Sequence, residues 1–197
     1  MKFLTFADLH GDFGLLKKLI KRAKEKDIEF VLLAGDFTAF ERSMRAILKK
    51  LNDIGKPIFI IPGNHEEGGE YKKAIKDYPN CRDVDRKAIE VDDFVILSYG
   101  GNGFSATDSE FRDIGRKWYG KYKDKKVILM THGPPYNTTL DSINGSHVGN
   151  KDYRKFIERI KPKLAISGHI HETFGAMDKI GKTQLINPGW EGMVVEL

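Results

Sequence analysis

Short apolar runs alternate with amphipathic segments along the first half of the chain. The runs at 2–7, 29–35 and 57–63 have the length and the β-branched and aromatic content of buried strands. Asp12 is the expected N-cap of a first helix, and the segment 66–78 is expected to be helical. Between the strands, apolar residues recur at helical spacing at Leu15, Leu16, Leu19, Ile20 and Ala23, and again at Met44, Ile47, Leu48 and Leu51. This β-α-β-α-β order predicts parallel strands connected by helices.

From residue 88 onwards the pattern changes and predicts some antiparallel pairing. The apolar segments 88–91 and 94–100 are separated only by Asp92-Asp93, which favours a hairpin. Further on, the pattern predicts helices at 111–122 and 153–160, buried strands at 126–131 and 163–167, and short antiparallel strands at 176–180, 183–186 and 193–197. The expected fold class is α/β, with two packed, mixed β-sheets flanked by helices.

Size and composition limit the class of protein. With 197 residues, of which 40% are hydrophobic, the chain can form one substantial core, so residues 1–197 are expected to form a single domain. No apolar stretch has the length of a signal peptide or of a membrane span. The single cysteine, Cys81, cannot form an internal disulfide, which agrees with a cytoplasmic protein.

The formal net charge is +5, but it does not indicate a polymeric nucleic acid as partner. The lysines are spread along helix-like segments such as KKLIKRAKEK and are interleaved with acidic residues. That distribution is typical of solvated helix faces. A basic protein nevertheless does not repel an anionic substrate. The oligomeric state stays open.

Polar residues that bind metals well follow five of the predicted strands. Five of the six histidines occupy these positions. These residues are Asp8 and His10 after the first strand, Asp36 after the second, Asn64 with His65 after the third, His132 after 126–131, and His169 and His171 after 163–167. Because sites in α/β sheets form at the carboxyl ends of strands, these side chains are expected to converge.

The pair His169 and His171 flanks a single isoleucine. In an extended chain, residues two apart point to the same side, so both imidazoles are expected to face one point. Asp8, His10, Asp36, Asn64, His132, His169 and His171 offer seven ligands, which is too many for one tetrahedral ion and suits two ions sharing a carboxylate.

The donor types narrow the metal and the chemistry. Mixed imidazole and oxygen donors fit divalent transition metals, with manganese expected first and iron, nickel, zinc or cobalt as alternatives, rather than calcium or magnesium. Two such ions suit hydrolysis of a phosphoester by in-line attack of a metal-bridging hydroxide. The chain has neither a G-x-S-x-G nucleophile motif nor a phosphate-binding P-loop.

In this order and spacing, Asp8-x-His10, Gly35-Asp36, Gly63-Asn64-His65-Glu66, His132-Gly133 and Gly168-His169-x-His171 resemble the five sequence blocks of the calcineurin-like metallophosphoesterases. The resemblance implies an αββα sandwich. It also implies that Asp8, His10 and His171 hold one metal, that Asn64, His132 and His169 hold the other, and that Asp36 bridges them. His65 then faces the substrate, and it either stabilises the transition state or protonates the leaving oxygen, so His65 and Asp36 are the expected catalytic residues. Many members have a further acidic residue after Gly-Asp, where this chain has Phe37-Thr38, so the surroundings of Asp36 stay open.

Three other residues are candidates for substrate contact. His147 and Asn150 lie in a glycine-rich connection, 141–150, which either lines the substrate pocket or is a plain surface loop. Tyr136 follows Pro134-Pro135, and it either helps to fix the loop or stacks on the substrate. The run from Gly100 to Gly103 is expected to be a turn, because its context does not fit a phosphate loop.

The leading hypothesis is a metal-dependent phosphoesterase that acts on a small phosphoester, nucleotides included. Phosphodiesters are slightly preferred, because compact members of the family often handle them. The alternatives are a phosphomonoesterase or nucleotidase, and a catalytically silent metal-binding scaffold of the same fold. Such scaffolds tend to lose a catalytic histidine, whereas every matching position is filled here, His65 included.

Overall fold

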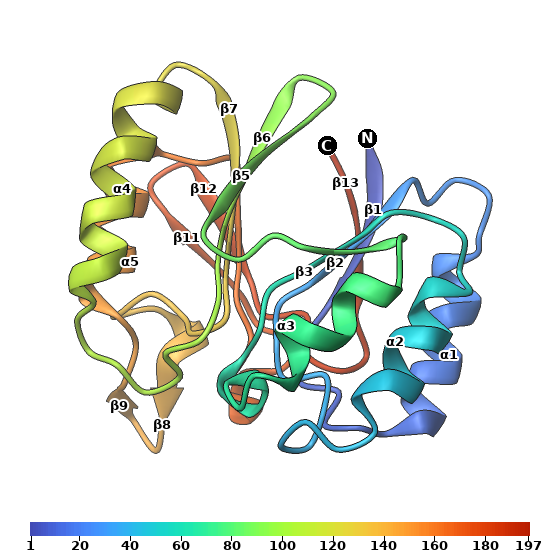
Figure 1. The fold of residues 1–197 in the computed structure, drawn as a ribbon. Helices are drawn as coiled ribbons and strands as arrows, with labels where there is room; N and C mark the ends of the chain where they lie inside the picture. Colours follow the sequence, from blue (N-terminus) through green and yellow to red (C-terminus); the bar gives the residue numbers. More distant parts are fainter.

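Two β-sheets lie face to face at the centre of the computed structural model, which describes residues 1–197 (Figure 1). The strands are β1 (Lys2–Phe6), β2 (Phe30–Leu33), β3 (Ile58–Ile60), β4 (Cys81–Asp83), β5 (Lys87–Val91), β6 (Phe94–Tyr99), β7 (Lys126–Thr131), β8 (Ser142–Ile143), β9 (Ser146–His147), β10 (Leu164–Ile166), β11 (Met177–Ile180), β12 (Thr183–Ile186) and β13 (Met193–Glu196). The helices are α1 (Phe13–Ala23), α2 (Met44–Asn52), α3 (Glu70–Ala74), α4 (Ser109–Tyr122) and α5 (Lys151–Ile160), with short 3-10 turns that include Asn64–Glu66.

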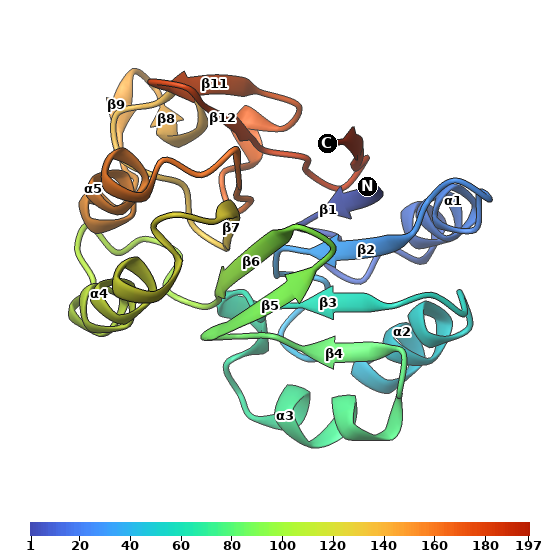
Figure 2. The same ribbon diagram turned by 90° about the horizontal axis from the view of Figure 1, so that it is seen from above.

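Both sheets are mixed, as the pattern predicts. The first has the order β13-β1-β2-β3-β4, in which β1 to β4 are parallel and β13 is antiparallel to β1. The second has the order β11-β12-β10-β7-β6-β5, with four parallel strands in the middle and an antiparallel strand at each edge. Seen from above, α1, α2 and α3 cover the outer side of the first sheet, and α4 and α5 cover that of the second (Figure 2).

Three apolar clusters hold these layers together. On β1, Leu4 and Phe6 pack toward α1 and α2, whereas Phe3 points the other way, as the two-residue period of a strand requires. Phe3 belongs to a central cluster of 15 buried residues drawn from both sheets, among them Phe59 and Ile128. A third cluster of 16 buried residues joins the second sheet to α4 and α5. Burial of these clusters is the main force that fixes one sheet against the other.

Local signals predicted α1 well. The Asp12 side chain accepts hydrogen bonds from the main-chain N–H groups of Gly14 and Leu15, which confirms it as the N-cap. The predicted helix at 66–78 is broken into α3 and two short 3-10 turns, because Gly68 and Gly69 interrupt it. Strand β4 was missed, since three residues with only one buried member leave no apolar run.

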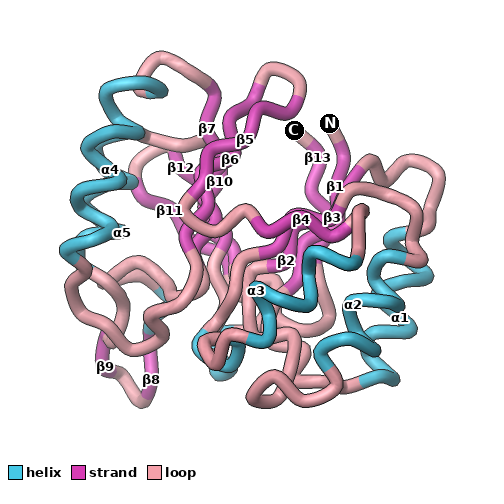
Figure 3. Tube along the Cα trace, viewed as in Figure 1, coloured by secondary structure: helices cyan, strands magenta, loops and turns pink.

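The C-terminal strands pair differently from a simple antiparallel series. Strands β11 and β12 form the expected hairpin, but β12 also lies parallel to β10. The chain then crosses to the other sheet, where β13 pairs with β1. The connection 141–150 contains a small hairpin, β8–β9, which projects at the lower end of the molecule (Figure 3). None of the helices combines the length and the apolar character that crossing a membrane requires.

Candidate metal centre

The predicted ligands follow the carboxyl ends of parallel strands in both sheets. The N-terminus lies at the upper end of β1 in Figure 1, so the carboxyl ends of β1, β2 and β3 point downward. Asp8, His10, Asp36 and Asn64 follow these three strands, while His132 follows β7 and the remaining two histidines follow β10. The packing of the two sheets therefore brings ligands from distant parts of the chain to one place, here called the metal centre.

The main chain at the metal centre adopts conformations that residues other than glycine rarely adopt. Asp8, His10, Asp36 and His169 have φ values of 56°, 46°, 51° and 70°, all in the left-handed region. Such values cost energy for residues other than glycine, and they cluster at functional sites. This conformation also corrects one expectation. The chain is not extended at His169, so His169 and His171 point to different groups of ligands.

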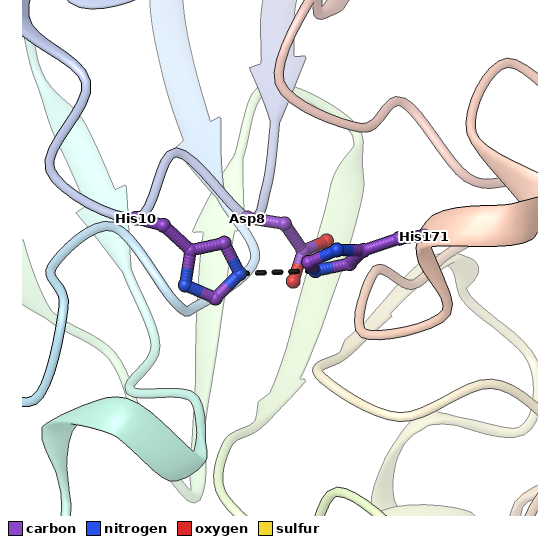
Figure 4. Close-up of side chains that lie close together, drawn as sticks. All are labelled: Asp8, His10 and His171. Atoms are coloured by element: carbon purple, nitrogen blue, oxygen red, sulfur yellow. Dashed lines mark hydrogen bonds between the residues drawn. The ribbon is translucent and has the colours of Figure 1, made fainter.

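The first group consists of Asp8, His10 and His171, whose ligand atoms all lie within 4.8 Å of one another (Figure 4). The Nε2 atoms of the two histidines are 3.0 Å apart. Both oxygens of buried Asp8 accept a hydrogen bond from the main-chain N–H of His169, at 3.1 and 2.9 Å. That bond fixes the carboxylate and ties the loop after β1 to the loop after β10.

The second group consists of Asp36, His132 and His169. Nδ1 of His132 donates to the main-chain oxygen of Ala34 at 2.8 Å, which turns Nε2 into the metal centre. There Nε2 lies 3.1 Å from Oδ1 of Asn64 and 3.4 Å from Oδ2 of Asp36. Asn64, the seventh predicted ligand, therefore joins this group.

Asp36 lies between the two groups, and His65 lies beside it. Asp36 also forms a set with His10 and His65 whose ligand atoms lie within 4.8 Å of one another. Oδ1 of Asp36 accepts from the main-chain N–H of His65 at 2.9 Å, and Oδ2 lies 3.9 Å from Nε2 of the same residue. A carboxylate placed in this way can contact two ions at once.

The donor set fits transition-metal ions. Nε2 of His169 is buried and has no hydrogen-bond partner. An unpartnered polar atom of this kind is costly, and a metal ion would supply the missing partner. Imidazole, carboxylate and amide donors together suit divalent transition metals. Asp36 belongs to the second group and also lies close to His10 of the first, so the two groups are placed to hold a pair of ions.

Burial and neighbouring charges set the protonation of these groups. Burial raises the pKa of Asp8 to about 7. Burial also acts to raise the pKa of Asp36, but the hydrogen bond and the charge of His132 outweigh it and lower that pKa to about 2. Conversely, burial acts to lower the pKa of His132, and Asp36 raises it to about 9. Burial lowers the pKa of His169 to about 4, so His169 is neutral and presents a nitrogen lone pair.

Glu66 supports the metal centre, a role that the sequence did not reveal. The side chain is 3% exposed and accepts four hydrogen bonds. Oε2 accepts from the main-chain N–H groups of Asp36 and Gly63, both at 2.9 Å. Oε1 accepts from the main-chain N–H of Thr38 at 2.9 Å and from its hydroxyl at 2.6 Å. Glu66 and Thr38 therefore join the loops after β2 and β3. In this chain Glu66, rather than an acidic residue directly after Asp36, accepts the hydrogen bond from the main chain of Asp36.

Gly103 is a second residue whose role was missed. A Cβ atom at this position would lie 2.8 Å from Nε2 of His169 and 2.9 Å from Oδ1 of Asn64. Only glycine lets the main chain pass so close to two ligands. The Gly-Gly-Asn-Gly sequence at 100–103 was the available signal. The predicted turn is present at Gly103 and Phe104, but the sequence did not show that Gly103 passes beside His169 and Asn64.

An open cleft of about 570 Å³ gives access to the metal centre. Six of its lining residues belong to the metal centre, namely His10, Asp36, Asn64, His65, His169 and His171. The others are Ala39, Phe104, Ile143, Ile170 and Glu172. No lysine or arginine is among them, so the lining itself supplies no permanent positive charge.

The three residues predicted to contact substrate are not among those that line the cleft. Oδ1 of Asn150 caps α5 by accepting from Asp152 and Tyr153, and its Nδ2 donates to Ser105. Nδ1 of His147 lies 2.8 Å from Oδ1 of buried Asp141, and the ring of Tyr136 lies 5.9 Å from that of His147. Their contact with substrate stays a prediction.

Comparisons with known proteins agree with this geometry. A family model described as calcineurin-like phosphoesterase matches residues 1–173. The uncharacterized protein MJ1162 of Methanocaldococcus jannaschii is 32% identical, over 95% of this chain and 88% of that protein. A probable glycerophosphodiester phosphodiesterase, GpdQ, of Arcobacter nitrofigilis is 22% identical over 73% of this chain and 56% of its own length. The crystal structure of TT1561 of Thermus thermophilus superposes with a TM-score of 0.77 at 19% identity, over 96% of this chain and 90% of that one.

Proposed function

The chain belongs to the calcineurin-like phosphoesterase family, and from that premise we propose that it is a dinuclear metal-dependent phosphodiesterase. The observation that supports this most is the position of Asp36, which lies between two groups of ligands and beside His65. A shared carboxylate can hold two ions close together, as two-metal hydrolysis of a phosphoester uses them, and a histidine beside it can act as a general acid.

The residues divide between two ions. Asp8, His10 and His171 would hold one ion, and Asn64, His132 and His169 would hold the other, with Asp36 shared between them. When bound, two such ions generate a nucleophile from water at neutral pH and stabilise negative charge on the phosphate oxygens. Manganese is the proposed metal.

His65 is the proposed catalytic group of the chain itself. Its side chain is 18% exposed, and its ring packs 4.5 Å from that of His10. The main-chain bond to Asp36 fixes its position at the mouth of the cleft. From there the imidazole can donate a hydrogen bond or a proton to the departing oxygen, which needs the proton as the ester bond breaks.

Beyond the two ions, the side chains of the cleft supply no positive charge that favours a monoester over a diester. A phosphomonoester carries up to two negative charges at neutral pH, whereas a diester carries one. The cleft lining contains no lysine or arginine to balance the extra charge, and it includes Glu172. Its apolar residues can instead contact the second ester group. The similarity to a probable glycerophosphodiester phosphodiesterase supports the same preference.

The first experiment measures metal content and turnover together. Elemental analysis of the purified protein should find about two transition-metal ions per chain, as a dinuclear centre requires. Hydrolysis of bis(p-nitrophenyl) phosphate and of p-nitrophenyl phosphate is then compared after chelation and after readdition of manganese. We expect chelation to abolish turnover, manganese to restore it, and the diester to have the higher kcat/KM.

Other outcomes assign the alternatives. A higher kcat/KM for the monoester would replace the diester preference with a phosphomonoesterase or nucleotidase. Two bound ions without turnover of either ester would favour a silent scaffold. Turnover that is unchanged after complete removal of metal would refute the proposed mechanism.

A further inference from the structure

The two most exposed large apolar side chains of the protein both lie at the metal centre. Phe40 is 73% exposed and Phe104 is 69% exposed. The ring of Phe40 stacks on that of His65, with centroids 4.0 Å apart and planes 19° from parallel. The ring of Phe104 meets that of His169 edge-on, at 4.3 Å. Exposed aromatic rings beside a catalytic cleft are typical of binding surfaces.

The main chain next to both rings is constrained. Phe40 has a φ of 51°, in the left-handed region where a bulky aromatic residue is an outlier. Glu41 follows with a φ of 60°, and its main-chain N–H donates to the hydroxyl of Thr38 at 3.0 Å. Phe104 comes directly after Gly103, which is fixed against Asn64 and His169. Strain of this kind persists where the surrounding structure and function require it.

The two rings lie against different parts of the metal centre. One face of Phe40 is covered by His65, which leaves the opposite face open to solvent. Phe104 lies against His169 of the second ligand group and lines the cleft. Because His65 faces the leaving oxygen, a group attached to that oxygen passes next to Phe40. Apolar Ala39 and Ile143 complete the walls nearby.

We propose that Phe40 and Phe104 form an aromatic subsite, which receives a planar aromatic ring carried by an ester group of the phosphodiester. This inference rests on the proposed function. A ring stacks on an open aromatic face with an attraction beyond that of buried area alone, which a flexible aliphatic group does not gain. A nucleobase and an aryl group share this chemistry.

Phosphinates, whose organic groups are attached through P–C bonds and which have no ester bond, test the subsite without being cleaved. Benzyl(methyl)phosphinate, cyclohexylmethyl(methyl)phosphinate and dimethylphosphinate are monoanions that imitate a diester and differ only in one substituent. Their dissociation constants for the metal-loaded protein are measured by calorimetry. Their inhibition constants are measured against bis(p-nitrophenyl) phosphate.

We expect the benzyl compound to bind roughly threefold to tenfold more tightly than the cyclohexylmethyl compound, and dimethylphosphinate to bind most weakly. In Phe40→Leu and Phe104→Leu, which keep an apolar side chain without a ring, the preference for benzyl over cyclohexylmethyl should shrink toward one. Phe13→Leu is the matched control. Phe13 is 41% exposed, but it lies at the start of α1 beside Lys50 and should leave the preference unchanged.

Equal binding of the benzyl and cyclohexylmethyl compounds to the wild-type protein, with diester hydrolysis intact, would overturn the aromatic subsite and leave the proposed function standing. A preference that survives in both leucine variants would also overturn it. If no phosphinate binds and no diester is hydrolysed by the metal-loaded protein, both the subsite and the proposed function are wrong.

Discussion

Replacement of Glu66 by glutamine tests how the metal centre is held together. Every hydrogen bond at this side chain is donated to it, two to each carboxylate oxygen. A glutamine of the same shape keeps one oxygen, and its NH2 group faces either two main-chain N–H donors or the N–H and the hydroxyl of Thr38, so two of the bonds to a charged oxygen are lost. A neutral amide therefore cannot accept a hydrogen bond from every donor around Glu66.

The expected loss follows from these contacts. Hydrogen bonds to a charged group contribute about 1.5–3 kcal/mol each, so two lost bonds remove about 3–6 kcal/mol. The two hydrogen bonds that remain are accepted by a neutral amide oxygen and are therefore weaker. Relief from burying a charge offsets several kcal/mol of this loss. We therefore expect Glu66→Gln to lower the free energy of unfolding by about 2–4 kcal/mol.

The assay is guanidinium unfolding of chelator-treated protein at pH 8, followed by far-ultraviolet circular dichroism. Removing metal first keeps ligand binding out of the measured stability. Because Glu66 also holds the main chain of Asp36, manganese affinity should fall about tenfold or more. Glu67→Gln is the control, since Glu67 is exposed and accepts only one long bond, from Asn102 at 3.4 Å. If the two variants unfold at the same denaturant concentration, the supporting role of Glu66 is refuted.

Three further substitutions test the rest of the metal centre, and a fourth, in α4, is a control. His65→Ala should keep about two ions per chain while kcat/KM falls by about 10²–10⁴, and a loss of metal in this variant would make His65 a ligand instead. Asp36→Ala should lose both metal, by elemental analysis, and hydrolysis; a variant that retained two ions would contradict the shared position. Gly103→Ala should weaken manganese binding in a calorimetric titration, because its Cβ would meet His169 and Asn64. Gly120→Ala is the control, because a Cβ at Gly120, in the last turn of α4, would meet nothing within 4 Å. We expect it to stabilise the protein by about 0.5–1 kcal/mol in the same unfolding assay. A matching loss of metal in this variant would show that the effect at Gly103 is not local.

The sequence by itself determined the features that depend on near neighbours. The alternation of apolar residues in β1 and the helical spacing in α1 arise from local geometry, so both elements and the Asp12 cap could be predicted. The sequence also placed Asp8, Asp36 and His132 directly after strands, because strand ends are marked by the end of an apolar run. The α/β class and the inventory of ligands followed from these signals.

Strand and helix patterns do not tell which of the predicted ligands meet; the family resemblance implied a grouping, and the tertiary structure brings the side chains together. His10 and His171 are 161 positions apart, and they come together because two separately predicted sheets pack face to face. His169 and His171 point to different groups because His169 has a left-handed φ, which no strand pattern predicts. In the same way, Glu66 became a support for Asp36 only when the loops after β2 and β3 were brought side by side. These contacts depend on the packing of the two sheets. The free energy that stabilises this packing comes from the whole core, so it cannot be read from the residues that meet.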